Sequence, residues 1–343
     1  MELGGSMKIL IISDLHHGTN SSESFINYQK KGLEYVKEII KKRDVDLVVN
    51  CGDTYDKRLA GDFMIIDTFK KIHKEISQMC EYIVIAGNHD CYYTNTNKIT
   101  SLPVMFEGGK LIIDDVYVKD NLIFCPWINE LNAPRISKQI SKHNNEKNYL
   151  FGHFDFSGFR HGQAISKKDS LFKTDYWKYK KIISGHYHMS QQKDNIFYCG
   201  SLYQKNRGEL EKKYCHLLNT ETNKIESFEM KERYYEKIII NDEKDFLLLK
   251  KCHNTISDVF INSSNEEFWV KVETKLGEYS PVKLTLTYKN DIINQCEELV
   301  DTDILTNEEL NHEFLCKLDH DDDDFKKEFE EMFKKYWEKS YEN

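Results

Sequence analysis

The sequence predicts an α/β fold, a layered sheet flanked by helices. Three observations carry this prediction. Short apolar runs, such as residues 8–12 and 46–50, have the length and continuity of buried strands. Longer stretches between them repeat apolar residues at helical spacing. Several of the apolar runs end in Asp, Asn or His, and ligands bind beyond the carboxyl ends of strands in open α/β sheets.

The first half of the chain alternates strands and helices. We expect strands at residues 8–12, 46–50 and 82–86, with helices at 24–43 and 63–79 between them. This order is typical of a sheet whose helices return the chain to the same edge. The polar ends of the three strands should therefore meet at one edge.

The second half begins with two more buried strands that end in polar groups, at residues 148–151 and 181–183. A β meander is expected next, formed by residues 196–199, 214–218 and 224–230. Together with the first half, these elements make one domain.

The character of the chain changes near residue 233. Strands at 237–240, 268–274 and 282–288, with a helix near 244–257, predict a small α+β domain over residues 233–290. Residues 291–343 are expected to be a helical, acidic tail. Residues 1–6 are interpreted as a cloning remnant before a native start at Met7, which leaves 7–232 as the main domain.

The charge is unevenly distributed. The 343 residues carry a formal net charge of -9, from 57 acidic and 48 basic side chains. Residues 290–343 contain 18 of the acids and 6 of the bases, so the preceding part holds 39 acids and 42 bases. The body is mildly basic, and the negative total does not exclude nucleic acid as a ligand.

The spacing of the cysteines and the hydropathy of the chain indicate the cellular compartment in which the protein works. Nine scattered cysteines, an odd number without a CxxC pair, argue against a disulfide framework and a structural zinc site. No apolar run is long enough to span a membrane, and no signal peptide is recognised. We therefore expect a cytoplasmic protein without a membrane partner.

Eight polar side chains follow apolar runs at five places in the chain. They are Asp14, His16, Asp53, Asn88, His89, His153, His186 and His188. A pair of divalent cations about 3.5–4 Å apart, bridged by a carboxylate, needs such an inventory to act on a phosphoryl group. Mixed carboxylate and imidazole ligands suit manganese, iron or zinc better than calcium. The alternative is ordinary turn residues, but the order and strand context of all five motifs favour a metal site.

These motifs resemble those of the calcineurin-like metallophosphoesterase superfamily. The matching segments are Asp14-x-His16, Gly52-Asp53, Gly87-Asn88-His89-Asp90, Gly152-His153 and Gly185-His186-x-His188. The resemblance implies a four-layer α/β/β/α metallophosphoesterase sandwich with a small α+β capping domain and a helical C-terminal tail.

The resemblance also implies a role for each residue. Asp53 would bridge two divalent metal ions, first of all Mn²⁺, with Mg²⁺, Fe²⁺ or Zn²⁺ as alternatives. One ion would be completed by Asp14, His16 and His188, and the other by Asn88, His153 and His186. His89 would protonate the leaving oxygen or stabilise its charge, and Asp90 would orient His89.

Within the superfamily, the chain is most similar to the nuclease subunit of SbcCD-type complexes, especially the small recombination-endonuclease subunit of tailed phages. Segments 52–58, 152–159, 184–188 and 198–203 carry this finer resemblance, which covers about residues 7–230. It implies a DNA exonuclease or endonuclease for end processing, recombination and repair, paired with a coiled-coil ABC-type ATPase (SbcC-like). If phage-encoded, it would act in the host cytoplasm.

Asp56 departs from the pattern of many cellular members, which carry His at this position for catalysis or substrate positioning. We therefore keep Asp56 among the catalytic candidates. Candidate DNA contacts are basic residues near the motif loops, although each could equally be a solvated surface residue. They are Lys57, Arg58, Arg160, Lys205 and Arg207.

Two interaction surfaces are expected. Apolar residues at helical spacing between 325 and 337 predict a helix face that docks either on a partner or on the body of the chain. The resemblance favours the ATPase partner, and it also implies a homodimer formed through helices near 63–79 and 97–105.

Two other function classes are open. One is a stand-alone metallophosphatase or cyclic-nucleotide phosphodiesterase of the same superfamily. The other is a non-catalytic scaffold with a vestigial metal site. The region after residue 230 favours the nuclease subunit over the first, and the intact ligand set argues against the second.

Overall fold

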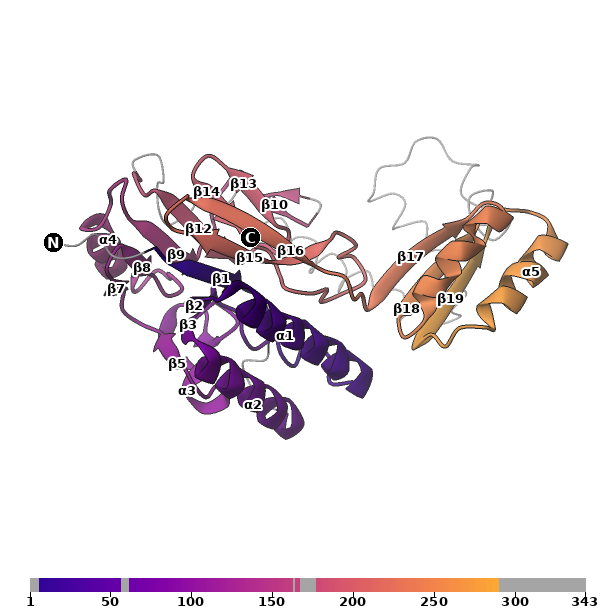
Figure 1. Ribbon diagram of the computed structural model, residues 1–343, viewed down its shortest axis with the longest axis horizontal. Helices are drawn as coiled ribbons and strands as arrows, with labels where there is room; N and C mark the ends of the chain where they lie inside the picture. The colour runs from indigo at the N-terminus through magenta and orange to yellow at the C-terminus, as the bar shows by residue number, and fades with distance from the viewer. Residues whose placement is uncertain (1–5, 57–61, 163, 167–176, 290–343) are drawn as a thin grey trace, which may run out of the picture.

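The computed structural model describes residues 6–56, 62–162, 164–166 and 177–289 (Figure 1). Two six-stranded sheets form the larger part of the molecule, and a smaller three-stranded unit lies at one end, beyond strand β16. The expected cloning remnant, apart from Ser6, and the expected acidic tail lie outside the described residues.

The first sheet is mixed, in the order β16-β15-β1-β2-β3-β6. Its strands are β1 (Lys8–Ile12), β2 (Leu47–Asn50), β3 (Glu81–Ile85), β6 (Lys110–Ile112), β15 (Lys213–Asn219) and β16 (Lys224–Met230). Strands β1, β2, β3 and β6 are parallel, and the hairpin of β15 and β16 joins β1 antiparallel. Helices α1 (Glu23–Arg43) and α2 (Phe63–Met79) make the returns, as predicted.

The second sheet has the order β13-β14-β12-β9-β8-β7. Its strands are β7 (Tyr117–Lys119), β8 (Leu122–Phe124), β9 (Tyr149–His153), β12 (Lys181–Gly185), β13 (Gln191–Lys193) and β14 (Ile196–Tyr198). Helix α4 (Ala133–Ser141) returns the chain from β8 to β9. Smaller elements are β4 (Cys91–Tyr93), β5 (Thr96–Thr100), α3 (Leu102–Met105), β10 (Arg160–His161) and β11 (Ala164–Ile165).

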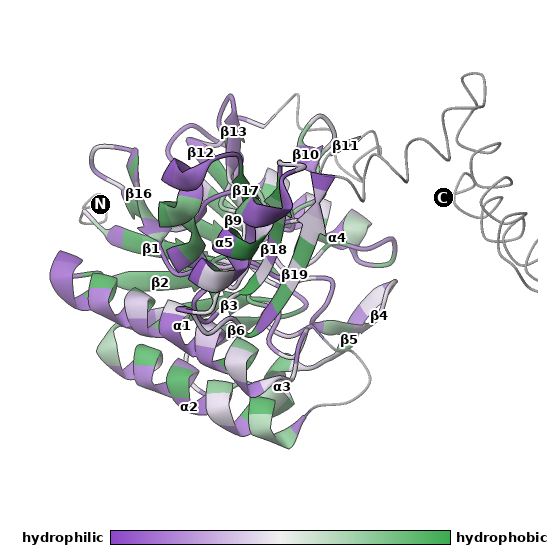
Figure 2. Cartoon of the chain, turned by 90° about the vertical axis from the view of Figure 1, so that its right-hand side faces the viewer, coloured by the Kyte–Doolittle hydropathy of each residue, from purple (hydrophilic) through white to green (hydrophobic). Residues whose placement is uncertain are grey.

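The side-chain alternation of the strands creates the layers. Leu10 and Ile12 of β1 pack among the residues of α1 and α2, whereas Ile9 and Ile11 face the second sheet. On the far side of the second sheet, Ile123 and its neighbours pack against α4. Figure 2 shows apolar residues in the strands between the layers, and polar and apolar residues alternating along α1 and α2. The result is helices, sheet, sheet, helix, which confirms the predicted four-layer sandwich.

The predicted meander is wrong in one respect. β14 does not lie beside β15; it pairs with β12 and β13 in the second sheet, while β15 and β16 form a hairpin in the first. Chain order cannot decide this, because the segment from 199 to 212 is long enough to cross between the sheets. The region 97–105, expected to be a helix, is strand β5 followed by the short helix α3.

The smaller unit is a parallel sheet in the order β17-β18-β19 with two helices. Its elements are β17 (Tyr235–Ile240), the 3-10 helix η2 (Glu243–Cys252), β18 (Ile256–Ile261), α5 (Glu266–Leu276) and β19 (Lys283–Tyr288). Its own core contains buried residues from all five elements except β19, which contributes partly buried ones. This is an α+β unit of the expected kind.

Two assignments within this unit are corrected. Residues 268–274 form part of helix α5 instead of a strand, because the Asn265 side chain caps its N-terminus and Val272 and Leu276 are buried one turn apart. The helix expected near 244–257 ends at Cys252, and residues 256–257 instead begin strand β18, whose residues alternate between buried and half-buried. Among the described residues, no helix is long and apolar enough to cross a membrane.

Candidate metal centre

The eight predicted side chains meet where strands of both sheets end. Asp14 and His16 follow β1, Asp53 follows β2, and Asn88 and His89 follow β3. These three strands are parallel neighbours, so their carboxyl ends lie at one edge of the first sheet. His153 ends β9, and His186 and His188 follow β12, its parallel neighbour in the second sheet.

The loops that carry these residues are sharply turned and joined to one another. Asp14, His16, Asp53 and His186 have positive φ angles, which non-glycine residues rarely adopt. Backbone hydrogen bonds from Asp14 N to the Gly52 carbonyl (3.0 Å) and from His16 N to the Asp53 carbonyl (2.9 Å) tie the β1 loop to the β2 loop. Such strained backbone persists where the surroundings hold it, and it is common at functional sites.

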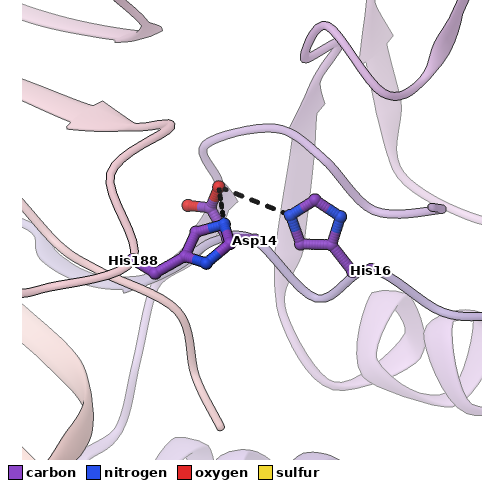
Figure 3. A group of neighbouring side chains, drawn as sticks. All are labelled: Asp14, His16 and His188. Atoms are coloured by element: carbon purple, nitrogen blue, oxygen red, sulfur yellow. Dashed lines mark ion pairs between the residues drawn. The ribbon is translucent and has the colours of Figure 1, made fainter. Parts of the chain in front are cut away.

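One group of ligand atoms brings together Asp14, His16 and His188 (Figure 3). Asp14 Oδ1 lies 3.8 Å from His16 Nε2 and 3.8 Å from His188 Nε2. Asp53 Oδ2 lies 3.6 Å from the same nitrogen of His16. These four residues are the set expected for one ion.

A second group is centred on His153. Its Nε2 lies 3.3 Å from Asp53 Oδ2 and 3.1 Å from Asn88 Oδ1. The same Asn88 oxygen is 3.1 Å from His186 Nδ1. These are the residues expected for the other ion, and Asp53 adjoins both groups, as a bridging ligand must.

The geometry around His16 fits a cation. Its Nδ1 is 2.9 Å from Asp56 Oδ1, so this nitrogen donates and Nε2 carries the lone pair. His16 Nε2 is fully buried and has no hydrogen-bond partner among the described residues, although it faces the carboxylates of Asp14 and Asp53. A buried lone pair beside two carboxylates is unfavourable unless a positive charge lies between them. The residues present therefore fit divalent metal ions.

The buried groups of the centre have strongly shifted pKa values, and those of His16 and His186 agree with this interpretation. Burial opposes ionisation of Asp53, but the surrounding imidazoles, first of all His153, together outweigh it and hold the pKa of Asp53 well below its usual range. Burial alone would lower the pKa of His153, yet Asp53 raises it to about 9. Burial lowers the pKa of His16 and of His186 to about 4 each. Both rings are thus neutral near pH 7, the state in which imidazole binds metals.

His89 lies beside this centre with a partly exposed ring. Its backbone N–H donates to Asp53 Oδ1 at 2.8 Å, which fixes it to the central carboxylate. Its Nδ1 lies 3.6 Å from Asp56 Oδ1 and 3.4 Å from the Asp56 carbonyl. Asp56 therefore contacts both His16 and His89.

The Asp90 carboxylate joins two of the loops. It is buried and accepts backbone N–H groups from Gly87 at 2.9 Å, Thr54 at 3.1 Å and Tyr55 at 3.1 Å. It thereby connects the loop after β2 to the loop after β3. The carboxylate that lies beside the His89 ring is that of Asp56, and the role of Asp90 in orienting His89 stays a prediction.

Sequence reasoning missed three residues around the centre. The Glu209 carboxylate contacts His188 Nδ1 at 2.8 Å, and Asp155 Oδ1 lies 3.9 Å from His186 Nε2. The ring centroid of Trp127 is 5.5 Å from that of His186. Asp155 stands two residues after a motif histidine, which was a usable signal, whereas nothing in the local pattern singles out Trp127 or Glu209.

The candidate DNA contacts differ in how close they lie to the metal centre. Lys57 and Arg58 lie outside the described residues. Arg160 is exposed in β10. Lys205 Nζ lies 3.8 Å from Asp56 Oδ1, next to the centre, whereas Arg207 pairs with Asp258 of the smaller unit at 3.0 Å. Lys205 is thus the candidate that the fold brings to the metal centre.

A four-layer sandwich with Asp, Asn and His clusters at the strand ends defines a metal-dependent phosphoesterase. The chain belongs to the calcineurin-like phosphoesterase family, whose model matches residues 7–190. This family uses divalent metal ions, and the chain is therefore a phosphoester hydrolase.

Two relatives give the range of sequence similarity. The chain is 26% identical over 235 residues to "Exonuclease subunit 1" of Enterobacteria phage T4, covering 64% of this chain and 67% of that protein. It is 25% identical over 226 residues to an uncharacterized protein of Acanthamoeba polyphaga mimivirus, covering 58% of this chain but only 16% of that protein.

Solved structures of phosphoesterases are more distant. Yfce, a phosphoesterase from E. coli, gives a TM-score of 0.32 at 12% identity, covering 65% of this chain and 98% of Yfce. The nuclease MPE of Pseudomonas putida gives a TM-score of 0.34 at 11% identity, covering 64% of this chain and 87% of the nuclease.

Proposed function

We propose that this chain is a metal-dependent DNA nuclease, the nuclease subunit of an ATPase–nuclease complex that processes DNA ends in recombination and repair. The observation that carries the proposal is the similarity to an exonuclease subunit over 235 residues, in a chain with a phosphoesterase site. The site accounts for the hydrolysis, and the similarity favours DNA over other phosphodiesters.

The residues of the centre are proposed to bind two metal ions. We propose that Asp53 is shared between two ions, with Asp14, His16 and His188 on one side and Asn88, His153 and His186 on the other. The metals, Mn²⁺ in the first place and Mg²⁺, Fe²⁺ or Zn²⁺ otherwise, would supply an activated water and neutralise phosphate charge. Buried, preorganised ligands avoid reorganisation during the reaction.

His89 is proposed to act on the leaving oxygen. Its backbone is held by Asp53 and its ring lies against Asp56, so the ring has a defined position. The ring is also partly exposed, as a group that meets a phosphodiester must be. Donating a proton, or a hydrogen bond, to the departing oxygen lowers the barrier to cleavage.

DNA binding needs basic groups beyond the metals. The proposal assigns to Lys205, whose Nζ is 3.8 Å from Asp56 Oδ1, a phosphate next to the one that is cut. Arg160 in the exposed hairpin of β10 and β11 is a second contact, and Lys57 and Arg58 are proposed from the sequence alone. Arg207 is the weakest candidate, because Asp258 already neutralises it.

Two protein partners are proposed. The coiled-coil ABC-type ATPase would bind the apolar helix face expected in the tail, outside the described residues. A second copy would pack on the end of α2 and the neighbouring α3, where Phe63 is 88% exposed and Val104 is 71% exposed. Six described cysteines have free thiols, which suits the proposed cytoplasmic location; they are Cys51, Cys80, Cys125, Cys199, Cys215 and Cys252.

The test compares two substrates. Full-length protein stripped of metal is given Mn²⁺ and either linear DNA or bis(4-nitrophenyl) phosphate, with and without the ATPase partner. We expect DNA to be degraded, and Asp53→Asn to lose this activity. Rapid turnover of the small diester with DNA left intact, even with the partner present, would support a stand-alone phosphatase or phosphodiesterase. No hydrolysis of either with metal bound would indicate a scaffold.

A further inference from the structure

Glu209 is a buried carboxylate that has no role in the hydrolysis proposed for the metal centre. It lies in the segment between β14 and β15 and is 8% exposed. Its Oε1 is 2.8 Å from His188 Nδ1. The opposite nitrogen of the same ring, Nε2, is the one that lies 3.8 Å from Asp14 Oδ1. Glu209 therefore approaches the ring from the side away from the metal centre.

The chemistry of this contact determines which nitrogen is free. An ionised carboxylate can only accept a hydrogen bond, so Nδ1 of His188 must donate. In a neutral ring Nε2 then carries the lone pair, which faces Asp14. A carboxylate behind a histidine in this way sets its tautomer and its orientation, and it increases the basicity of the ligating nitrogen.

Glu209 is itself held firmly. Its Oε2 lies 2.7 Å from Nζ of Lys213, a side chain that is 3% exposed, and accepts the backbone N–H of Lys205 at 3.1 Å. The Gln204 side chain donates to the Glu209 carbonyl at 2.7 Å. Both the carboxylate and the backbone of Glu209 are therefore fixed before any ligand binds.

Other histidines of the centre have comparable supports, but from different groups. Asp56 supports His16 Nδ1 at 2.9 Å, and the Cys51 carbonyl lies 2.8 Å from His153 Nδ1. His16 and His153 are fully buried, whereas the His188 side chain is 25% exposed. A partly exposed ring is confined less by packing, so its hydrogen bond matters more for its position.

We propose that Glu209 is a positioning residue that orients His188 and thereby strengthens the binding of one of the two metal ions, the ion next to Asp14. The proposal rests on the proposed role of His188 as a ligand. It predicts different effects on the two ions, because the contacts of the Glu209 carboxylate with described residues include His188 but not His153 or Asn88.

The experiment titrates metal-free, full-length protein with Mn²⁺ alone and measures stoichiometry and affinity by calorimetry. Substituting Glu209→Gln keeps the size of the side chain but removes its charge, and Glu209→Asp keeps the charge but withdraws it from the ring. We expect each variant to bind one Mn²⁺ about 10- to 100-fold more weakly than the original protein. The other Mn²⁺ should bind unchanged.

The matched control is Glu211→Gln. Glu211 also pairs with Lys213, at 2.5 Å, but does not contact His188. This variant should bind both ions as the original protein does. His188→Ala should lose the same ion that Glu209→Gln weakens.

Thermal unfolding of the metal-free variants separates positioning from a purely structural role. Normal binding of both ions by Glu209→Gln and Glu209→Asp would overturn the proposal, whatever their melting temperatures. Equal weakening of both ions would overturn it as well. If His188→Ala keeps both ions, the ligand assignment itself fails, and the role of Glu209 fails with it.

Discussion

At the scale of single residues, three aspartates near the metal centre differ in what they contact. Asp53 faces the histidines of both ligand groups. Asp56 contacts the rings of His16 and His89. The Asp90 carboxylate accepts hydrogen bonds from backbone N–H groups of two loops, and so it holds these loops together. All three aspartates lie in loops that follow β2 or β3, but each contacts a different kind of partner.

The substitution Asp90→Asn tests this difference. The amide nitrogen of Asn cannot accept, so buried N–H groups of Gly87, Thr54 or Tyr55 would lose their acceptor, at a cost of about 2–4 kcal/mol. We expect a lower free energy of unfolding together with weaker Mn²⁺ binding. The comparison is His89→Ala, which should abolish hydrolysis while stability and metal binding persist. Unchanged stability in Asp90→Asn would contradict the role in loop structure.

A buried histidine away from the metal centre predicts a pH dependence of stability. His216 Nε2 donates to the Cys199 carbonyl at 2.8 Å, and Nδ1 lies 2.9 Å from Ser227 Oγ, which donates to it. Burial lowers the pKa of His216 to about 4, from 6.5. Between pH 6.5 and about pH 4, His216 is protonated in the unfolded chain but stays neutral in the folded protein. Stability is therefore lost as pH falls below about 6.5.

The matched variant is His216→Gln, which keeps a donor for the Cys199 carbonyl but does not titrate. Urea unfolding is compared between about pH 8 and about pH 4. The stability of the original protein relative to the variant should be constant above about pH 7 and fall by on the order of 3 kcal/mol towards pH 4. Parallel pH profiles for the two proteins would show that His216 does not contribute.

At the scale of elements, the site depends on turns that bring three loops very close together. A methyl group at Gly87 would overlap the carboxylate and the backbone nitrogen of Asp53. Gly52, with φ of +106°, lies similarly against the ring of His153. Glycine is needed here because the loops after β2 and β3 touch at Asp53.

Gly87→Ala should therefore displace Asp53. We expect Mn²⁺ binding to fall by more than about 100-fold and hydrolysis to be lost, because both ligand groups include Asp53. Calorimetry measures the binding. Gly162→Ala is the control, since an added methyl there meets open space, and its cost is limited to the positive φ, about 1 kcal/mol. A Gly87→Ala protein with two tight Mn²⁺ sites would contradict the geometry.

At the scale of the whole molecule, one buried side chain joins the sandwich to the smaller unit. The Gln204 side chain donates to the carbonyls of Glu209 and Tyr235, at 2.7 and 3.0 Å. It accepts the backbone N–H groups of Tyr234 and Tyr235, at 2.9 and 3.1 Å. The same residue therefore supports the segment of Glu209 and the start of strand β17.

Gln204→Leu removes all four hydrogen bonds and leaves buried backbone groups unpaired. We expect a loss of about 2–4 kcal/mol in unfolding free energy and faster amide exchange in β17. Arg207→Ala, which breaks the exposed ion pair with Asp258, is the control and should cost under about 1 kcal/mol. Similar exchange rates in both variants would mean that Gln204 does not join the two units.

The sequence by itself determined the layered α/β fold and the list of candidate ligands. Continuous apolar runs and helical spacing are local patterns, so β1, β2, α1 and α2 could be predicted within one or two residues. The motifs could be recognised because each is a contiguous segment at the end of an apolar run. Their convergence followed from a rule of parallel sheets, which bring carboxyl ends to one edge.

Tertiary structure alone decided the relations that join distant segments. Placement of β14 in the second sheet depends on pairing across the fold, and α5 depends on a cap and a buried face that outweigh the β-forming residues Phe268, Trp269 and Val270. The contact of Glu209 with His188 and the different partners of Asp56 and Asp90 are relations between loops. Hydrogen-bond partners are chosen by distance in space, which local sequence patterns do not encode.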